Sequence, residues 1–292
     1  MSKIFKINKL TYKYDKERKA LDSVSMDFNK GDIIGIIGSN GSGKSTLFNN
    51  LMGILKSAEG EILYKENPLK YDKKSLYNLR KEVGIVFQDP EKQIFYSMVY
   101  DDLAFALRNI GIDEKTIKER INKALDAVNG KEFINRPVHS LSFGQKKRVA
   151  IASVIAMENE LVLLDEPTAG LDPQGQHEMM ELDPESTRAI VDIIKKMHAQ
   201  GKKIVITSHD MNLIYDICDF VYVLNQGKII DEGKVEDVFT HEDIIKEAGL
   251  EFPWLVKLNK HMNLPLFRTE EDLYNYWDEN FGDNLKIISK WN

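Results

Sequence analysis

Eight consecutive residues near the N-terminus have the types and the order of a phosphate-binding loop. They read Gly-Ser-Asn-Gly-Ser-Gly-Lys-Ser from position 38, between an apolar run at Ile33–Ile37 and a run of helical character at Thr46–Leu55. Glycines let the backbone turn so tightly that several N–H groups point at phosphate oxygens, and the helix that follows adds the positive end of its dipole. The alternative, a Gly/Ser-rich turn with an exposed lysine, would require the spacing and both flanking elements to be coincidence.

The chemistry expected of this loop is the binding of a nucleoside triphosphate. We expect Lys44 to neutralise the β- and γ-phosphates and Ser45 to bind Mg²⁺. The residues expected to bind nucleotide in this segment are Gly38, Ser39, Asn40, Gly41, Ser42, Gly43, Lys44, Ser45 and Thr46.

A pair of carboxylates at the end of an apolar run is the second candidate for chemistry. Leu161–Leu164 is wholly apolar, and Asp165 and Glu166 follow it directly. We expect Asp165 to hold Mg²⁺ through its water shell and Glu166 to polarise the water that attacks the γ-phosphate. A strand that ends in charge is also a common exit to a loop, so the pair indicates an NTPase site because the phosphate-binding loop lies upstream.

Short apolar runs predict the sheet that must position these residues. The first thirty residues alternate with period two, as at Val24, Met26 and Phe28, and predict a small antiparallel β-subdomain. Further along, continuous apolar runs predict a parallel sheet covered by helices, because a strand buried on both faces has no polar side. The predicted fold class is therefore α/β. The continuous runs are 83–87, 161–164, 204–207 and 221–224.

Two further regions complete the predicted organisation. Helical periodicity from about 98 to 157 predicts a helical subdomain inserted in the sheet, and Asn225-Gln226-Gly227 predicts a hairpin. We place the nucleotide-binding domain at 1–240 and a C-terminal extension at 241–292. The aromatic content of this last region predicts either a dimerisation subdomain between protomers or a small core of its own. All three tryptophans lie there, at Trp254, Trp277 and Trp291.

The composition argues against several classes of protein. The net charge of −6 gives no positive field to hold DNA or RNA, so we expect no nucleic-acid partner. The single cysteine, Cys218, lies in an apolar segment and is expected to be a buried hydrophobe, which suits a reducing, cytosolic compartment. Apolar runs such as Val149–Met157 end well before the roughly 20 residues of a membrane-spanning helix. We expect contact with a membrane to go through a partner.

A third motif resembles part of a known family. Residues 140–145 read Ser-Leu-Ser-Phe-Gly-Gln and precede a basic helix start at 146–148. They resemble the signature loop of ATP-binding-cassette ATPases, which have a P-loop NTPase fold, although Phe143 stands where that family usually has glycine. The resemblance extends over residues 4–240. Its motifs, in order, are Tyr14, the phosphate-binding loop, Gln88, the signature, Asp165-Glu166, Leu171-Asp172 and His209.

The resemblance implies that two such chains dimerise head to tail and hydrolyse ATP with Mg²⁺. It implies that Ser142, Gly144 and Gln145 of one protomer cover the nucleotide on the phosphate-binding loop of the other, which agrees with the affinity of a helix N-terminus for anions. Asp172 would lie in the loop that crosses the dimer interface and bind nucleotide across it.

Three single residues take their expected roles from the resemblance. Tyr14 would stack on adenine, although an aromatic residue in a strand is as often simply part of that strand. Gln88 would bind Mg²⁺ and sense the attacking water, although a polar residue at a strand end is usually just surface. His209 follows an apolar run and precedes Asp210, a suitable helix N-cap, so it would project toward the γ-phosphate.

One stretch is similar to a particular branch of this family. Residues 88–95, together with 141–152, resemble the ATPases of energy-coupling-factor importers, the cobalt-type and vitamin-type uptake systems of prokaryotes. The resemblance implies a peripheral ATPase on the cytoplasmic face of the cell membrane. Its partners would be a second ATPase subunit, identical or a close paralogue, a transmembrane coupling subunit that docks beside Gln88, and a membrane protein that captures the substrate.

The cargo and the alternatives follow from the same resemblance. It favours cobalt, and a vitamin, nickel or an exported compound are the alternatives within the family. A soluble cassette that acts on ribosomes or DNA would carry a second cassette or long coiled coils, and the sequence has neither. A nucleotide-gated module without catalysis would lack Glu166 or His209, and both are present.

A short repeat follows the carboxylate pair. Leu171-Asp172-Pro173 recurs as Leu182-Asp183-Pro184. Asp followed by Pro is a helix-start signal, so each copy is a candidate start. We expect the first copy to form the interface loop, residues 174–183 to form a surface excursion, and Thr187–Met197 to be helical.

Overall fold

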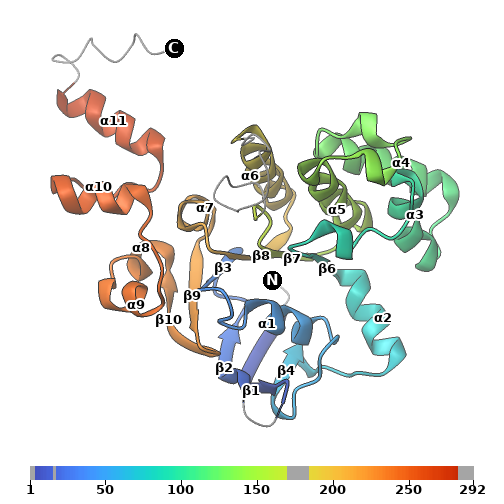
Figure 1. Ribbon diagram of the computed structural model, residues 1–292, viewed down its shortest axis with the longest axis horizontal. Helices are drawn as coiled ribbons and strands as arrows, with labels where there is room; N and C mark the ends of the chain where they lie inside the picture. Colours follow the sequence, from blue (N-terminus) through green and yellow to red (C-terminus); the bar gives the residue numbers. More distant parts are fainter. Residues whose placement is uncertain (1–3, 16–17, 170–183, 282–292) are drawn as a thin grey trace.

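The computed structural model describes residues 4–15, 18–169 and 184–281, and these form two sheets with a helix packed between them (Figure 1). The antiparallel sheet contains β1 (Phe5–Lys13), β2 (Lys19–Asp27), β4 (Glu59–Tyr64) and β5 (Asn67–Pro68). The larger sheet contains β3 (Ile33–Ile37), β6 (Val83–Val86), β7 (Leu161–Asp165), β8 (Lys203–Ser208), β9 (Phe220–Asn225) and β10 (Lys228–Lys234).

The larger sheet has the order β10-β9-β3-β8-β7-β6, and its strands other than the edge strand β10 are largely buried on both faces. Its strands are parallel except that β10 pairs antiparallel with β9. In β3, Ile33 and Ile37 join one hydrophobic cluster, whereas Ile34 and Ile36 join the other. Burial on both faces explains the continuous apolar runs and confirms the predicted parallel sheet. The predicted hairpin at residues 225–227 is also confirmed, as the turn between β9 and β10.

The antiparallel sheet has the order β2-β1-β4-β5 and confirms the predicted β-subdomain. Helix α1 (Lys44–Leu51) lies between the two sheets and buries Leu47 and Phe48 there. This helix begins before the predicted Thr46 and ends before the predicted Leu55. The early end has a local cause, because Gly53 takes a left-handed conformation with a φ of 61°.

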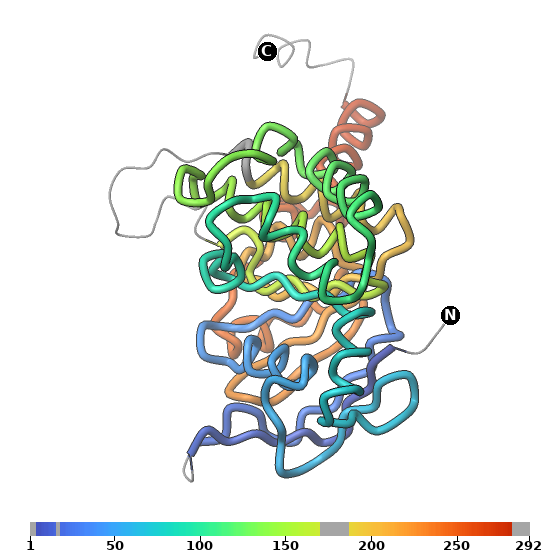
Figure 2. Tube along the Cα trace, turned by 90° about the vertical axis from the view of Figure 1, so that its right-hand side faces the viewer, coloured from blue at the N-terminus to red at the C-terminus, as the bar shows by residue number. Residues whose placement is uncertain are grey.

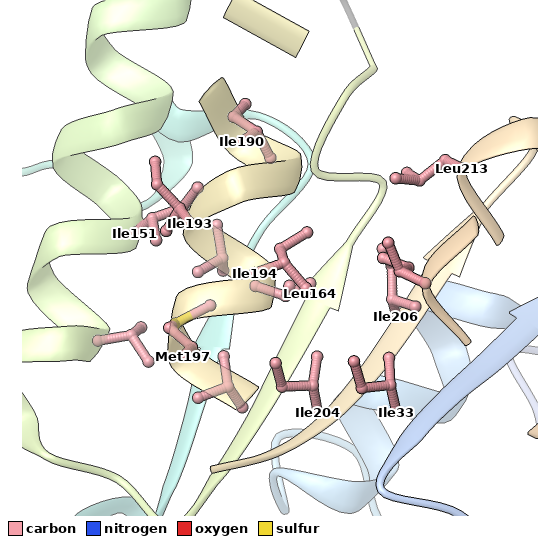
Figure 3. Packing of buried hydrophobic residues seen from close by; sticks show 14 of the residues in the cluster. Ile33, Ile151, Leu164, Ile190, Ile193, Ile194, Met197, Ile204, Ile206 and Leu213 are labelled. Carbon is pink, nitrogen blue, oxygen red and sulfur yellow. The ribbon is translucent and has the colours of Figure 1, made fainter. Parts of the chain in front are cut away.

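Helices cover the other face of the larger sheet. Figure 3 shows helix α6 laid against the sheet, with Ile194 beside Leu164 of β7 and Ile193 beside Ile151. It begins at Pro184, so the second Asp-Pro pair predicted a helix start correctly. The first copy of the repeat and residues 174–183 lie outside the described residues. The helices of this face and its edges are α3 (Val99–Asn109), α4 (Glu114–Ala127), α5 (Phe143–Met157), α6 (Pro184–Ala199) and α7 (Met211–Ile217). Helix α2 (Lys73–Glu82) instead packs through Leu79 into the cluster that contains α1.

Helices α3, α4 and α5 pack on one another and form most of residues 98–157. They lie at the opposite end of the molecule from β1 and β2 (Figure 2). Short 3-10 helices at Pro90–Lys92, Lys131–Phe133 and Val138–Ser140 connect them to the sheet and to each other.

The C-terminal helices continue the main core. Phe239 and Ile245 belong to the same hydrophobic cluster as α7, and the Tyr215 hydroxyl donates to the carbonyl of Phe267 at 3.0 Å. The alternative of a separate small core is therefore wrong, and packing between protomers stays a prediction, as does the domain division at residue 240. Cys218 is buried in this core, as predicted. These helices are α8 (Val235–Val238), α9 (Glu242–Glu247), α10 (Trp254–Met262) and α11 (Glu270–Phe281).

Candidate active site

The phosphate-binding loop turns from the end of β3 into the start of α1. Gly41 and Gly43 have φ angles of 80° and 116°, which glycine adopts without strain. Gly43 is the N-cap of α1, so no side chain caps this helix, and its first turn carries no acidic residue. The N–H groups and the positive dipole at the start of α1 are therefore available to an anion.

Lys44 connects this loop to the end of β7. Its side chain is 7% exposed, and its ammonium group donates to the carbonyls of Gly38 at 2.7 Å and Ser39 at 3.3 Å. The same group lies 3.4 Å from Glu166 Oε1. The structure thus brings together the loop lysine and the strand-end carboxylate, which the sequence assigns to one site.

Glu166 is held in an uncommon backbone conformation. Its φ of 46° lies in the left-handed region, which costs a non-glycine residue about 1–3 kcal/mol. Its N–H donates to the carbonyl and to the hydroxyl of Thr207, both at 3.1 Å. The Thr207 hydroxyl in turn donates to Asp165 Oδ1 at 2.7 Å. Thr207 therefore fixes both acidic residues, and its position as a polar residue at the end of an apolar run was the signal that sequence reasoning missed.

His209 contacts the Glu166 carboxylate. Its Nδ1 lies 2.7 Å from Glu166 Oε2, and its backbone N–H donates to the same oxygen at 3.2 Å. The imidazole is half exposed, whereas the carboxylate is buried. His209 is thus placed to orient Glu166.

An open pocket of about 900 Å³ lies over the phosphate-binding loop. Arg18 and Lys19 are on its wall beside Lys44, and together these cations favour a polyanionic ligand. Sequence reasoning missed both, because they lie in and next to a connection between strands that carries no motif. The predicted site residues on the wall are Tyr14, Asn40, Gly41, Gly43, Lys44, Ser45, Thr46, Gln88 and Glu166.

Tyr14 stands at the rim of this pocket. Its hydroxyl lies 3.1 Å from Thr46 Oγ1, in the first turn of α1, and Tyr12 packs edge-on against its ring. The side chain is nevertheless 63% exposed. A fixed ring with an exposed surface beside the phosphate-binding loop is suited to stacking on a base.

The predicted Mg²⁺ ligands supply oxygen atoms, which Mg²⁺ prefers. Ser45 and Gln88 lie on the pocket wall, whereas Asp165 is buried at the end of β7 and accepts the Thr207 hydroxyl through Oδ1. Among the residues that the structure describes, no group of three or more His, Cys, Asp or Glu side chains is arranged to hold a metal ion. A hydroxyl, an amide and a carboxylate next to a phosphate-binding pocket fit Mg²⁺.

The signature loop forms the start of α5 and caps it. Ser142 is the N-cap, and its Oγ accepts the N–H of Gln145 at 3.3 Å while Gln145 Oε1 accepts the N–H of Ser142 at 3.1 Å. This reciprocal pair is a capping box. Ser142, Gly144 and Gln145 are absent from the wall of the described pocket. Asp172 lies outside the described residues.

Further along α5, Lys147 is fully buried beneath the site. Its ammonium group donates to the carbonyls of Phe87, Gln88 and Glu166. Burial lowers the pKa of Lys147 to about 8, and nearby carboxylates, chiefly that of Asp165, oppose this shift. In the sequence, this lysine is recognisable only as part of a basic helix start.

Comparisons with known proteins agree with this geometry. The family model for the ABC transporter matches residues 21–169. The cobalt import ATP-binding protein CbiO of Salmonella typhimurium is 44% identical over 265 residues, which are 91% of this chain and 93% of CbiO. The energy-coupling factor transporter ATP-binding protein EcfA2 of Clostridium perfringens is 38% identical over 288 residues, covering 99% of this chain and 96% of EcfA2.

A solved structure also matches most of the chain. The structure of cbiO1 from Clostridium perfringens, part of the ABC transporter complex cbiONQ, has a TM-score of 0.73 and 38% sequence identity. The match covers 89% of this chain and 100% of the other.

Proposed function

This chain belongs to the ATP-binding cassettes of ABC transporters and is an ATPase, and from that premise we propose that it drives an importer of the energy-coupling-factor type, with cobalt as the cargo. The names of the relatives support this, since they include a cobalt import protein and an energy-coupling factor protein. A vitamin or nickel is the alternative cargo. A separate membrane protein would capture the cargo, so the residues of this chain do not distinguish between these cargoes. A soluble, non-transport role is less well supported by these relatives.

The contact between Lys44 and Glu166 is the observation that carries the proposed chemistry. Lys44 and the uncapped start of α1 bind the phosphates of ATP, because they combine positive charge with N–H donors. Glu166 orients the attacking water and accepts its proton, while His209 holds the carboxylate in place. Lys44 and Glu166 both act on the γ-phosphate, which would lie over the phosphate-binding loop.

The remaining pocket residues bind the metal and the base. Mg²⁺, held by Ser45, Gln88 and Asp165, supplies positive charge to the phosphate oxygens. Tyr14 stacks on adenine through the exposed part of its ring.

A second ATPase subunit completes the site, whether this chain or a close paralogue. Ser142, Gly144 and Gln145 lie at the start of α5 and away from the pocket wall of their own protomer. They cover the nucleotide of the second subunit, and Asp172 contributes to that interface.

Exposed aromatic residues beside Gln88 are the proposed docking surface for the transmembrane coupling subunit. Phe95 is 77% exposed, and the rings of Tyr96 and Phe105 lie 5.4 Å apart. Asp102 accepts the backbone N–H groups of Phe95 at 2.8 Å and Tyr96 at 3.1 Å, so this surface is held in place.

Within the described ranges, no helix has the length and apolar character needed to cross a bilayer. We propose, from the relatives' names, that the chain binds at the cytoplasmic face of the cell membrane through its partners, the coupling subunit and the substrate-capture protein.

Replacing Glu166 by glutamine tests the proposed chemistry. We expect Glu166→Gln to lower the hydrolysis rate by about 10²- to 10⁴-fold, because it removes the proton acceptor. ATP binding should persist, and a dimer should accumulate with ATP and Mg²⁺ in sedimentation experiments. Glu160→Gln, at an exposed ion pair before β7, is the matched control and should hydrolyse ATP normally. Full turnover in Glu166→Gln would refute the assigned role.

Uptake measurements test the transport role and the cargo. Cells that lack this chain should lose uptake of radiolabelled cobalt and regain it with the wild-type chain but not with Glu166→Gln. Loss of nickel or vitamin uptake instead would identify that cargo.

A change at Phe95 tests the docking surface. Phe95→Ser should release the chain from membranes and leave the ATP affinity of the purified chain unchanged. The control Ile54→Ser, at an exposed residue just after α1, should stay membrane-bound. Retention of Phe95→Ser on membranes would argue against the docking surface.

A further inference from the structure

Lys147 is an unusual residue for the place it occupies. Lysine is almost never fully buried unless it is paired, because removing an ammonium group from water is costly. Lys147 projects from α5 and is fully buried, and its hydrogen-bond acceptors are three backbone carbonyl oxygens. An ammonium group has three N–H donors, so these three carbonyls satisfy it completely.

The carbonyls come from the two strand ends that border the pocket. Phe87 and Gln88 follow β6, with Glu166 at the end of β7. Lys147 therefore bridges the α5 helix to both strand ends. Gln93 reinforces one of these connections, because its side chain accepts the N–H of Phe87 at 3.1 Å and donates to Ala150 of α5 at 3.0 Å.

The carbonyl of Glu166 that Lys147 contacts belongs to a residue with a strained backbone. Glu166 has a φ of 46°, and such a conformation persists only when its surroundings hold it. Thr207 binds the N–H of Glu166, and Lys147 binds its carbonyl at 3.2 Å. The residue is thus held from both sides, and loss of either contact would let the backbone relax and move the carboxylate.

We propose that Lys147 is a positioning residue for ATP hydrolysis, which holds the peptides of Gln88 and Glu166 and ties their position to α5. The inference rests on the proposed role of Glu166. Ser142 caps the same end of this helix. Because a helix transmits a shift along its axis, movement of the Ser142 loop against a second subunit would reach Glu166 through Lys147.

Steady-state kinetics of three variants test this inference. Lys147→Met keeps a stem of similar volume and removes the donors, so we expect kcat to fall at least about tenfold while KM for ATP stays within about threefold. Lys147→Gln retains two N–H donors and should recover part of the loss. Lys146→Met is the matched control, because the neighbouring Lys146 pairs with Glu91 at the surface, and it should keep kcat.

A double-mutant cycle separates positioning from general damage. If Lys147 acts mainly through Glu166, Lys147→Met should cause a much smaller fold-loss of kcat in the Glu166→Gln background than in the wild-type chain. Additive losses would overturn the inference, and so would wild-type kcat in Lys147→Met. If circular dichroism shows that Lys147→Met does not fold, Lys147→Gln takes its place in the cycle, with the same expected outcome. Full turnover in Glu166→Gln alone would instead refute the proposed role of Glu166, so the two failures are distinguishable.

Discussion

The starts of helices α1 and α5 contain similar residues, but only the start of α5 is capped by side chains. Each has a glycine close to its start, Gly43 and Gly144, and a lysine in its first turns, Lys44 in α1 and Lys146 in α5. The start of α1 has a glycine N-cap and no side-chain partner, whereas Ser142 and Gln145 cap α5 reciprocally. The first helix therefore leaves its N–H groups for a ligand, and the second satisfies part of its own.

This difference in capping indicates different functions for two loops whose sequences both suggest anion binding. An uncapped start binds phosphate with backbone donors in its own protomer. A capped start is already ordered, and its serine hydroxyl accepts one N–H while its own hydrogen stays available to a further acceptor. We infer that the start of α1 binds nucleotide in its own protomer and that the start of α5 completes the site of a second subunit. Four changes test this comparison.

Lys44→Ala should have the largest effect. It removes the ammonium group that we propose binds the phosphates, so we expect the affinity for ATP to fall at least about 100-fold. Isothermal titration of the purified chain measures this. Lys146→Ala makes the same change at the start of α5 and should leave ATP affinity unchanged. Equal losses in the two variants would abolish the distinction between the helix starts.

Ser142→Ala should have an intermediate effect. Loss of the N-cap lowers the free energy of unfolding by about 1 kcal/mol, and loss of the hydroxyl should weaken ATP-dependent association about tenfold. Urea denaturation and sedimentation in the Glu166→Gln background measure the two effects. Ser140→Ala removes a neighbouring hydroxyl that donates to Pro137 and should leave association unchanged.

Gln145→Ala distinguishes the hydroxyl from the cap in the same assays. It breaks the other half of the capping box and leaves the Ser142 hydroxyl intact. If it weakens association as much as Ser142→Ala, order in the loop is the important property and the hydroxyl is not.

The smallest effect is expected from the C-terminal helices, which leave both helix starts untouched. Met262 and Tyr274 are exposed apolar residues on α10 and α11, and changing both to serine should weaken association without nucleotide by a few-fold. ATP affinity should not change. Truncation after Gly233 is a poorer test, because it would uncover the core around Phe239. Unchanged association in the double variant would argue against dimerisation through these helices.

The parts of the fold that could be predicted are those in which local pattern and burial coincide. Runs such as Ile204–Ile206 are apolar because both faces of the sheet are covered, so the sequence alone reveals the strands. The site residues in motifs were found for a similar reason, since phosphate chemistry restricts residue types at fixed spacing. Thr207 and Arg18 carry no such restriction, and their roles depend on which strands become neighbours.

Lys147 shows why burial of a charged residue was harder to predict. It stands in a row of three basic residues, which is typical of an exposed helix start. The available signal was spacing, because Lys147, Ile151 and Val154 recur at intervals that share one helix face, and all three are buried. The packing of the C-terminal helices on α7 had no comparable signal, since aromatic composition does not say which surface it covers.

The order of the larger sheet also governs when the protein becomes functional during its synthesis. Strand β3 is completed at Ile37, but its neighbours on both sides are β8 and β9, which begin at Lys203 and Phe220. A ribosome that adds about 5–20 residues per second needs on the order of ten seconds to supply them. A nascent chain released before Lys203 would therefore carry the whole phosphate-binding loop and still bind no ATP, because the strand that ends in that loop would have no partner on either edge.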